Sequence, residues 1–117
     1  MRRGEIRVVD LEPARGSEAD TRRPAIIVSN DGANASVARH GRGVVTVVPL
    51  TSNVRRILPF QVLLAAAETG LSADSKAQAE QVRAVAVERV RARIGAVPPT
   101  LLAQVDAALA LHLALDR

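Results

Sequence analysis

Five β-branched residues stand in a row at positions 44–48, Val-Val-Thr-Val-Val, and no other segment of the chain favours a single secondary structure so clearly. β-Branched side chains favour strands, and a run without polar alternation is typical of a strand that is buried on both faces. Further strands are predicted at 5–11, 24–29 and 60–64, each short and rich in Val, Ile or Leu.

Polar segments rich in turn-forming residues separate these strands. Residues 12–23 contain Pro13 and Gly16 and are predicted to form a loop, and residues 30–43 are predicted to form a long polar connection that includes His40. Thr51, Ser52 and Asn53 begin a turn that leads into a second basic loop at 54–59.

The C-terminal third of the sequence is less uniform. Residues 76–90 have helix-favouring composition but partly alternate polar and apolar residues, so local sequence leaves helix and strand both open. After Pro98-Pro99, Leu102, Val105, Leu109 and Leu113 recur at helical spacing, which predicts an amphipathic helix over about 98–115 whose apolar stripe packs on a core or a dimer partner. We therefore expect a single domain over 1–117, mainly β with a C-terminal α-helix, in which strand-rich residues 1–97 form a small barrel or curled sheet.

The charge distribution indicates a partner that is a polyanion. The net charge is +4, and residues 1–60 contain ten arginines against six acidic residues, whereas residues 61–117 are balanced. Arginine offers planar, paired donors that match phosphate oxygens. The chain has no cysteine, no signal-peptide pattern and no apolar run long enough to span a bilayer, so we expect a cytoplasmic protein without a membrane partner.

Several common chemistries lack their residues in this sequence. Gly41-Arg42-Gly43 is not a phosphate-binding loop of the Walker type, and no His, Cys or carboxylate cluster has the spacing of metal ligands, so neither a metal nor another cofactor is expected. Phe60 is the only aromatic residue, which argues against base stacking on an aromatic platform. His40 and His112 are interpreted as ordinary surface or half-buried residues.

An ordered set of short motifs resembles the MazF/PemK family of toxins along nearly the whole chain. The N-terminal motifs are Gly4-Glu5-Ile6, Val9-Asp10-Leu11, Pro13, Gly16-Ser17-Glu18, Arg23-Pro24-Ala25 and Val28-Ser29-Asn30-Asp31. The later ones are Val48-Pro49-Leu50-Thr51-Ser52-Asn53, Pro59-Phe60, Glu80-Gln81-Val82-Arg83 and Gly95-Ala96-Val97. Many relatives have Trp or Tyr where Arg7 and Val8 stand here, so this chain lacks an aromatic RNA contact near its first strand.

The resemblance implies an SH3-like barrel of the PemK/CcdB type that forms a homodimer. It also implies a sequence-specific endoribonuclease (an mRNA interferase) that acts on single-stranded RNA and is inhibited by a cognate antitoxin with an acidic tail. The family's functional pair matches Arg23, which precedes the Pro, and Thr51, which follows the buried strand.

This pair suits cleavage of RNA without a metal ion. The 2′-hydroxyl of RNA is the nucleophile, so the enzyme must stabilise the charge on phosphorus and move protons. Arg23 is predicted to hold the phosphate, Thr51 to donate to it or to position the 2′-hydroxyl, and Glu18 to orient Arg23 or to act as base. RNA contacts are predicted from the two basic loops and from the 80–83 segment, namely from Arg15, Ser17, Arg22, Ser52, Asn53, Arg55, Arg56, Gln81 and Arg83.

Two other functions remain open on the same barrel. One is a protein-binding poison like the CcdB toxins that trap DNA gyrase, which would not need the Arg-Pro and Thr-Ser elements. The other is a basic barrel that binds nucleic acid without cutting it, which predicts salt-sensitive binding alone.

Overall fold

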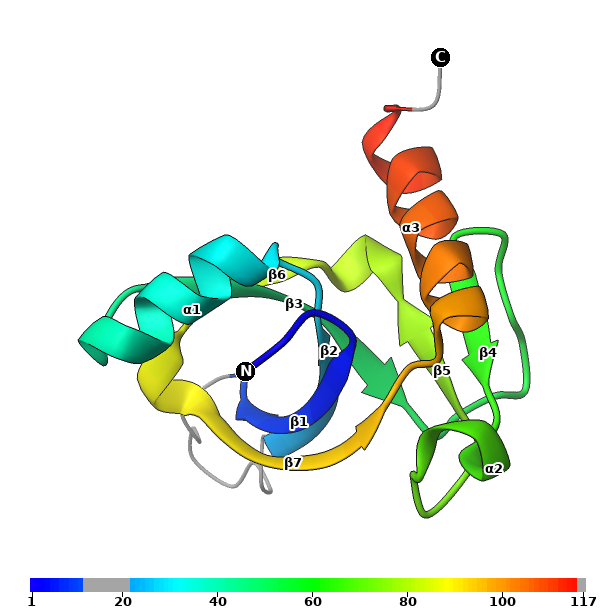
Figure 1. Cartoon of the computed structure of the whole chain (residues 1–117). Helices are drawn as coiled ribbons and strands as arrows, with labels where there is room; N and C mark the ends of the chain where they lie inside the picture. Colours follow the sequence, from blue (N-terminus) through cyan, green and yellow to red (C-terminus); the bar gives the residue numbers. More distant parts are fainter. Residues whose placement is uncertain (12–21, 116–117) are drawn as a thin grey trace, which may run out of the picture.

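In the computed structural model, residues 1–11 and 22–115 are described, and a curved antiparallel sheet forms the body of the molecule (Figure 1). The strands are β1 (Glu5–Asp10), β2 (Arg22–Ile27), β3 (Val44–Thr51), β4 (Gln61–Leu64), β5 (Ser75–Gln78), β6 (Arg83–Ala86) and β7 (Val90–Ala96). The helices are α1 (Asp31–His40), α2 (Ala66–Thr69) and α3 (Pro99–Leu113), and the 3₁₀ turns are η1 (Ala79–Gln81) and η2 (Val87–Arg89).

Strand β3, the strand predicted from the β-branched run, lies at the centre of the sheet. One edge pairs with β2, where Ala25 lies opposite Pro49 and Ile27 lies opposite Val47. The other edge pairs first with β6 and then with β5, which reaches Leu50 and Thr51. Val45, Val47 and Val48 are buried as predicted, but the prediction of burial on both faces is wrong for Val44, which is 59% exposed.

The segment 76–90, which local sequence left between helix and strand, contains two short strands separated by a turn. Strands β5 and β6 pair with different halves of β3, and η1 makes the bend that carries the chain from one to the other. Because this bend separates β5 from β6, the two strands can pair with different halves of β3 and the sheet can curl.

The long polar connection predicted at 30–43 contains a helix that was not predicted, because residues 31–40 form helix α1 and His40 is its last residue. The side chain of Asn30 accepts a hydrogen bond from the amide of Ala33 at 2.8 Å, and Gly41 ends the helix in the left-handed conformation at φ 68°. The only buried residue of α1 is Asn34, whose side chain is hydrogen-bonded to Ser29. Apart from Val37, which packs against the smaller core group, the helix is held by polar contacts that an apolar periodicity does not reveal.

Two groups of buried apolar side chains form the core, one on each face of the central strands. The larger group contains Ile6, Ile26, Val48 and Leu50 and is covered by α3 through Val105 and Ala108. The predicted C-terminal helix is confirmed, but its outer end is not packed, since Leu113 is 49% exposed. In Figure 1 the last turns of α3 extend beyond the sheet. The smaller group contains Val9, Leu11, Ala25, Ile27, Val45, Val47 and Val85.

Candidate active site

Arg23 and Thr51 lie at adjacent strand ends. The sequence predicted a loop at Arg23 and a turn beginning at Thr51. Both predictions are wrong, because Arg22 and Arg23 begin β2 and Thr51 ends β3. The pairing of β2 with β3 ends where Ala25 lies opposite Pro49, two residues from Arg23 on one strand and two residues from Thr51 on the other. The fold therefore brings the predicted functional pair to one place.

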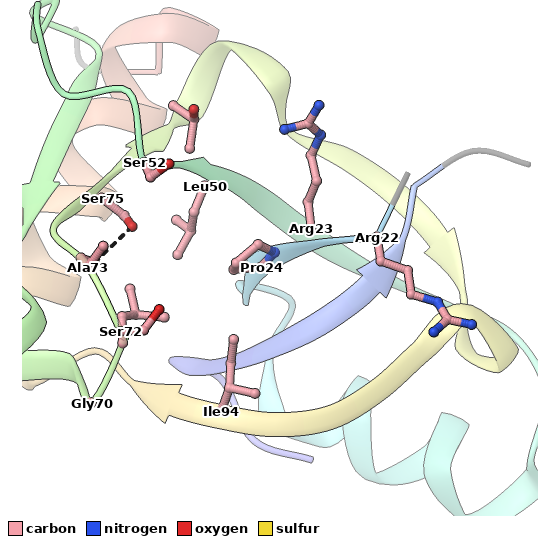
Figure 2. A pocket seen from close by; sticks show the side chains of 12 residues that line it. Arg22, Arg23, Pro24, Leu50, Ser52, Gly70, Ser72, Ala73, Ser75 and Ile94 are labelled. Atoms are coloured by element: carbon pink, nitrogen blue, oxygen red, sulfur yellow. Dashed lines mark hydrogen bonds between the residues drawn. The ribbon is translucent and has the colours of Figure 1, made fainter. Parts of the chain in front are cut away.

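Both residues line the same pocket, which has a volume of about 490 Å³ (Figure 2). Its described lining comes from the start of β2, the end of β3, the turn between α2 and β5 with the first residue of β5, and β7. The lining residues are Arg22, Arg23, Pro24, Leu50, Thr51, Ser52, Gly70, Leu71, Ser72, Ala73, Ser75 and Ile94. No acidic side chain is among them, so the ionised groups of this lining are two guanidinium groups.

The two arginines at the start of β2 differ in their partners. Arg22 donates to Asp10 at 3.0 Å, and Asp10 also accepts two hydrogen bonds from Arg91 at 2.8 and 2.5 Å. The hydrogen bond from Arg91, followed by the one from Arg22, holds the pKa of Asp10 below its usual value. The side chain of Arg23 is exposed and makes no hydrogen bond or ion pair with another described residue. Of these two guanidinium groups, that of Arg23 can therefore bind an anion without first breaking a contact with another described residue.

The turn after β3 fixes the orientation of the Thr51 hydroxyl. The oxygen Oγ1 of Thr51 accepts from the amide of Asn53 at 3.2 Å, and the side chain of Asn53 accepts from the amide of Arg55 at 3.3 Å. With its oxygen engaged in this way, the hydroxyl of Thr51 still has a proton to donate.

The second basic loop, residues 54–59, is anchored at both ends. The ammonium group of Lys76 donates to the carbonyl of Arg56 at 2.7 Å. At the far end, Gln61 accepts from the amide of Leu58 at 3.0 Å and donates to Glu80 at 2.7 Å. The other oxygen of Glu80, Oε1, is buried without a hydrogen-bond partner in the described part of the chain. Arg55 and Arg56 are exposed on this loop but do not line the pocket.

The remaining predicted site residues are not gathered in the pocket. Asn53 is exposed in the turn beside it, Gln81 is exposed at the end of η1, and Arg83 is half-buried on β6 opposite Val47. Arg15, Ser17 and Glu18 fall outside the described residues, so the predicted roles of these three side chains stay predictions.

The predictions missed the wall of the pocket that faces Arg23. It is formed by Gly70, Leu71, Ser72, Ala73 and Ser75, with Ile94 from β7 below them (Figure 2). Small and apolar residues of this kind carry no chemical signature in a sequence, and only the tertiary fold brings them beside β2.

The arrangement of a guanidinium group and a hydroxyl at the rim of a pocket suits an anionic oxygen substrate, above all a phosphodiester. Among residues 1–11 and 22–115, no three His, Cys, Asp or Glu side chains are grouped as metal ligands. None of the described helices has the length and apolar character needed to cross a membrane.

The family model of the PemK-like, MazF-like toxins of type II toxin–antitoxin systems matches residues 2–113. The chain therefore belongs to this toxin family.

Curated relatives support the same class. The chain is 63% identical to Endoribonuclease MazF9 of Mycobacterium tuberculosis over 113 residues, which are 97% of this chain and 96% of the relative. It is 28% identical to Endoribonuclease EndoA of Bacillus subtilis over 116 residues, which are 98% of this chain and 96% of that protein.

Among solved structures, a mycobacterial endoribonuclease in complex with its cognate antitoxin superposes with a TM-score of 0.78 at 25% identity, covering 100% of this chain and 98% of that one. The prediction of a toxin endoribonuclease of the MazF/PemK family is confirmed by these names. The predicted fold, mainly β with a C-terminal helix in a small barrel-like arrangement, is confirmed as well.

Proposed function

We propose that the chain cleaves single-stranded RNA at a phosphodiester held between Arg23 and Thr51. One observation carries the proposal: the start of β2 and the end of β3 bring to the same pocket a hydroxyl and a guanidinium group that has no partner among the described residues. Family membership supplies the general class of activity, and this placement supports the assignment of the two residues.

The proposed reaction is an internal transesterification. The 2′-hydroxyl oxygen attacks the neighbouring phosphorus, the bond from phosphorus to the 5′-oxygen breaks, and the products are a 2′,3′-cyclic phosphate and a 5′-hydroxyl. The nucleophile loses a proton and the leaving oxygen gains one, so the reaction consumes no other reagent. A duplex is a poor substrate on this proposal, because in-line attack needs a nucleotide that can turn out of the helix.

Arg23 stabilises the charge that develops on the non-bridging oxygens. A guanidinium group stays protonated, so its contribution is electrostatic and it does not serve as the base. Thr51 donates its hydroxyl proton to the same phosphate or positions the 2′-hydroxyl. Glu18 is proposed to orient Arg23 or to act as the base. No metal ion or other cofactor is part of this proposal.

The RNA strand is proposed to run from the pocket over the basic loops. Arg22 and Ser52 line the pocket beside the functional pair, and Asn53, Arg55 and Arg56 continue outward along the turn and the 54–59 loop. Gln81 and Arg83 on the β5–β6 bend, and Arg15 and Ser17, complete the proposed set of RNA contacts.

The proposed protein partners are a cognate antitoxin and a second copy of the chain. An acidic antitoxin tail suits a pocket whose described lining contains guanidinium groups and no carboxylate. Large apolar side chains exposed in the described part of the protomer favour an interface that covers some of them, and those at the end of α3 are Leu111, Leu113 and Leu115. The proposed location is the cytoplasm.

The test is RNA cleavage in the presence of EDTA, with purified wild-type protein and the Arg23→Ala and Thr51→Ala variants. Wild-type protein is expected to cut RNA with the metal chelated. Arg23→Ala is expected to lose about 10²–10³-fold in rate, the usual effect of removing one preorganised donor to a transition-state oxyanion. Arg39→Ala and Thr100→Ala are matched controls, since both residues are exposed and lie outside the pocket.

Each alternative function has its own signature in this experiment. Salt-sensitive binding of RNA without cleavage by wild-type protein would identify a non-catalytic binding barrel. Growth arrest in cells without any effect on RNA would identify a protein-binding poison. Unchanged cleavage by both Arg23→Ala and Thr51→Ala would rule out the assigned pair.

A further inference from the structure

The pocket is larger than the phosphate group assigned to it. Its volume of about 490 Å³ lies within the roughly 300–1,000 Å³ typical of pockets that enclose a small organic molecule. Arg23 and Thr51 belong to the strand ends on one side. The space between them and the 70–75 wall is therefore left for another part of the substrate (Figure 2).

This remaining space has aliphatic sides. Pro24 and Leu50 come from the central strands, Leu71 comes from the opposite wall, and Ile94 rises from β7. Ile94 is 38% exposed, which leaves part of its surface available to a ligand. Such a space favours a flat organic group over further phosphate, because desolvating a second anion against aliphatic carbon is unfavourable.

Two hydroxyls in the lining have no described partner. Ser52 follows β3 and Ser72 follows α2, and neither side chain makes a hydrogen bond within the described residues. Ser75, by contrast, donates to the carbonyl of Ala73 at 3.2 Å. A free hydroxyl can both donate and accept. The lining thus offers hydrogen-bonding groups for the edges of a ring whose faces contact aliphatic carbon.

The wall that carries Leu71 and Ser72 is held in place by its own hydrogen bonds. The amide of Ala66 donates to Asp74 at 2.8 Å, and the amide of Leu71 donates to the hydroxyl of Thr69 at 3.3 Å. Strand β7 approaches this wall closely at Gly95, where an added Cβ would lie 2.4 Å from the carbonyl oxygen of Thr69. The backbone of this wall and the backbone of β7 therefore lie in close contact beside the pocket.

We propose that this pocket holds one nucleobase, that of a nucleotide attached to the bound phosphate, and that Ile94 and Ser72 help to determine which base is accepted. The proposal rests on the proposed function, because it takes the phosphate to be held at Arg23. On this proposal, aliphatic contacts and serine hydroxyls select the base. Phe60, the only Phe, Tyr or Trp in the sequence, lies against His112 and does not line the pocket.

Two measurements test it with the Ile94→Ala and Ser72→Ala variants. The first maps cleavage positions on an RNA library of random sequence. We expect the base preference at one position next to the cut to fall by about tenfold in each variant, since contacts in an apolar pocket discriminate between ligands by roughly 10–200-fold. The base preferences at the other positions should stay unchanged. The second measures binding of the four nucleoside 3′,5′-bisphosphates by NMR, and we expect the wild-type preference among them to decrease in both variants.

Val44→Ala and Ser36→Ala are the matched controls, because both residues are exposed and lie outside the pocket. A cleavage motif and a bisphosphate preference that stay as in wild type for both test variants would overturn the base pocket and leave the nuclease proposal standing. A third outcome is that wild-type protein does not cleave RNA but binds the bisphosphates with a base preference that Ile94→Ala weakens. This outcome would overturn the nuclease proposal and support the base pocket. Equal binding of all four bisphosphates by wild-type protein would overturn the pocket.

Discussion

Neighbouring residues of like charge have different environments at the start of β2. Side chains alternate between the two faces of a strand, so Arg22 and Arg23 point to opposite sides, as Figure 2 shows. Arg22 is drawn to Asp10 and thereby to Arg91, whereas Arg23 is left beside the pocket. The sequence motif Arg-Arg-Pro gives no indication of which guanidinium group is engaged, and the strand geometry decides it.

The Asp10 carboxylate is expected to make stability depend on pH in the acidic range. Its pKa in the folded chain is lowered from the usual 3.8, chiefly by the hydrogen bond from Arg91. A lowered folded pKa means that the carboxylate stabilises the fold fully above the unfolded pKa and that this contribution is lost as the pH falls through the folded pKa. The melting-temperature difference between wild type and Asp10→Asn should therefore be constant above about pH 5 and shrink below about pH 4. A difference that grows on acidification would contradict the assignment.

At the scale of elements, strands with an apolar signature were predictable and the helix without one was not. The run 44–48 and the spacing of Leu102, Val105 and Leu109 reflect burial directly, so β3 and α3 could be predicted from sequence. Helix α1 buries a single residue, and that residue is polar, so its sequence resembles a loop. The strands around 76–90 were ambiguous because their partners, the two halves of β3, are distant in sequence.

Replacement of Asn34 by Ala tests how α1 is held. The Asn34 side chain accepts from the hydroxyl of Ser29 at 2.5 Å and donates to its carbonyl at 2.8 Å, and the same hydroxyl accepts from the amide of Thr46 on β3. Asn34→Ala leaves partly buried groups of Ser29 without this partner, so we expect the free energy of unfolding to fall by about 1–3 kcal/mol in urea denaturation. Ser36→Ala, on the exposed side of α1, should change it by less than about 0.5 kcal/mol. Equal effects of the two substitutions would mean that the Asn34–Ser29 contacts do not hold the helix.

At the scale of the whole molecule, the pocket is a product of chain topology. Its lining comes from four segments spread between residues 22 and 94, and the sheet brings them together because β3 pairs with β2 on one edge and β5 on the other. Two of these segments, at 22–24 and 50–52, overlap motifs that resemble the family and were therefore predictable from sequence. The 70–75 wall and Ile94 were not, because their position depends on the close approach of β7 to Thr69 at Gly95.

The excess of positive charge in residues 1–60 affects the behaviour of the whole molecule, because it determines how strongly the binding of RNA depends on salt concentration. Each phosphate neutralised by an arginine releases counterions, so the logarithm of the binding constant for single-stranded RNA falls with the logarithm of salt concentration by about 0.7 per contact. If the 54–59 loop contacts phosphates, Arg55→Ala and Arg56→Ala should each reduce that slope by about 0.7, measured by fluorescence anisotropy with a labelled RNA at several salt concentrations. Arg39→Ala, on the exposed surface of α1, should leave the slope unchanged. A slope that stays at the wild-type value in both loop variants would remove this loop from the RNA path, because its arginines would then be solvated charges only.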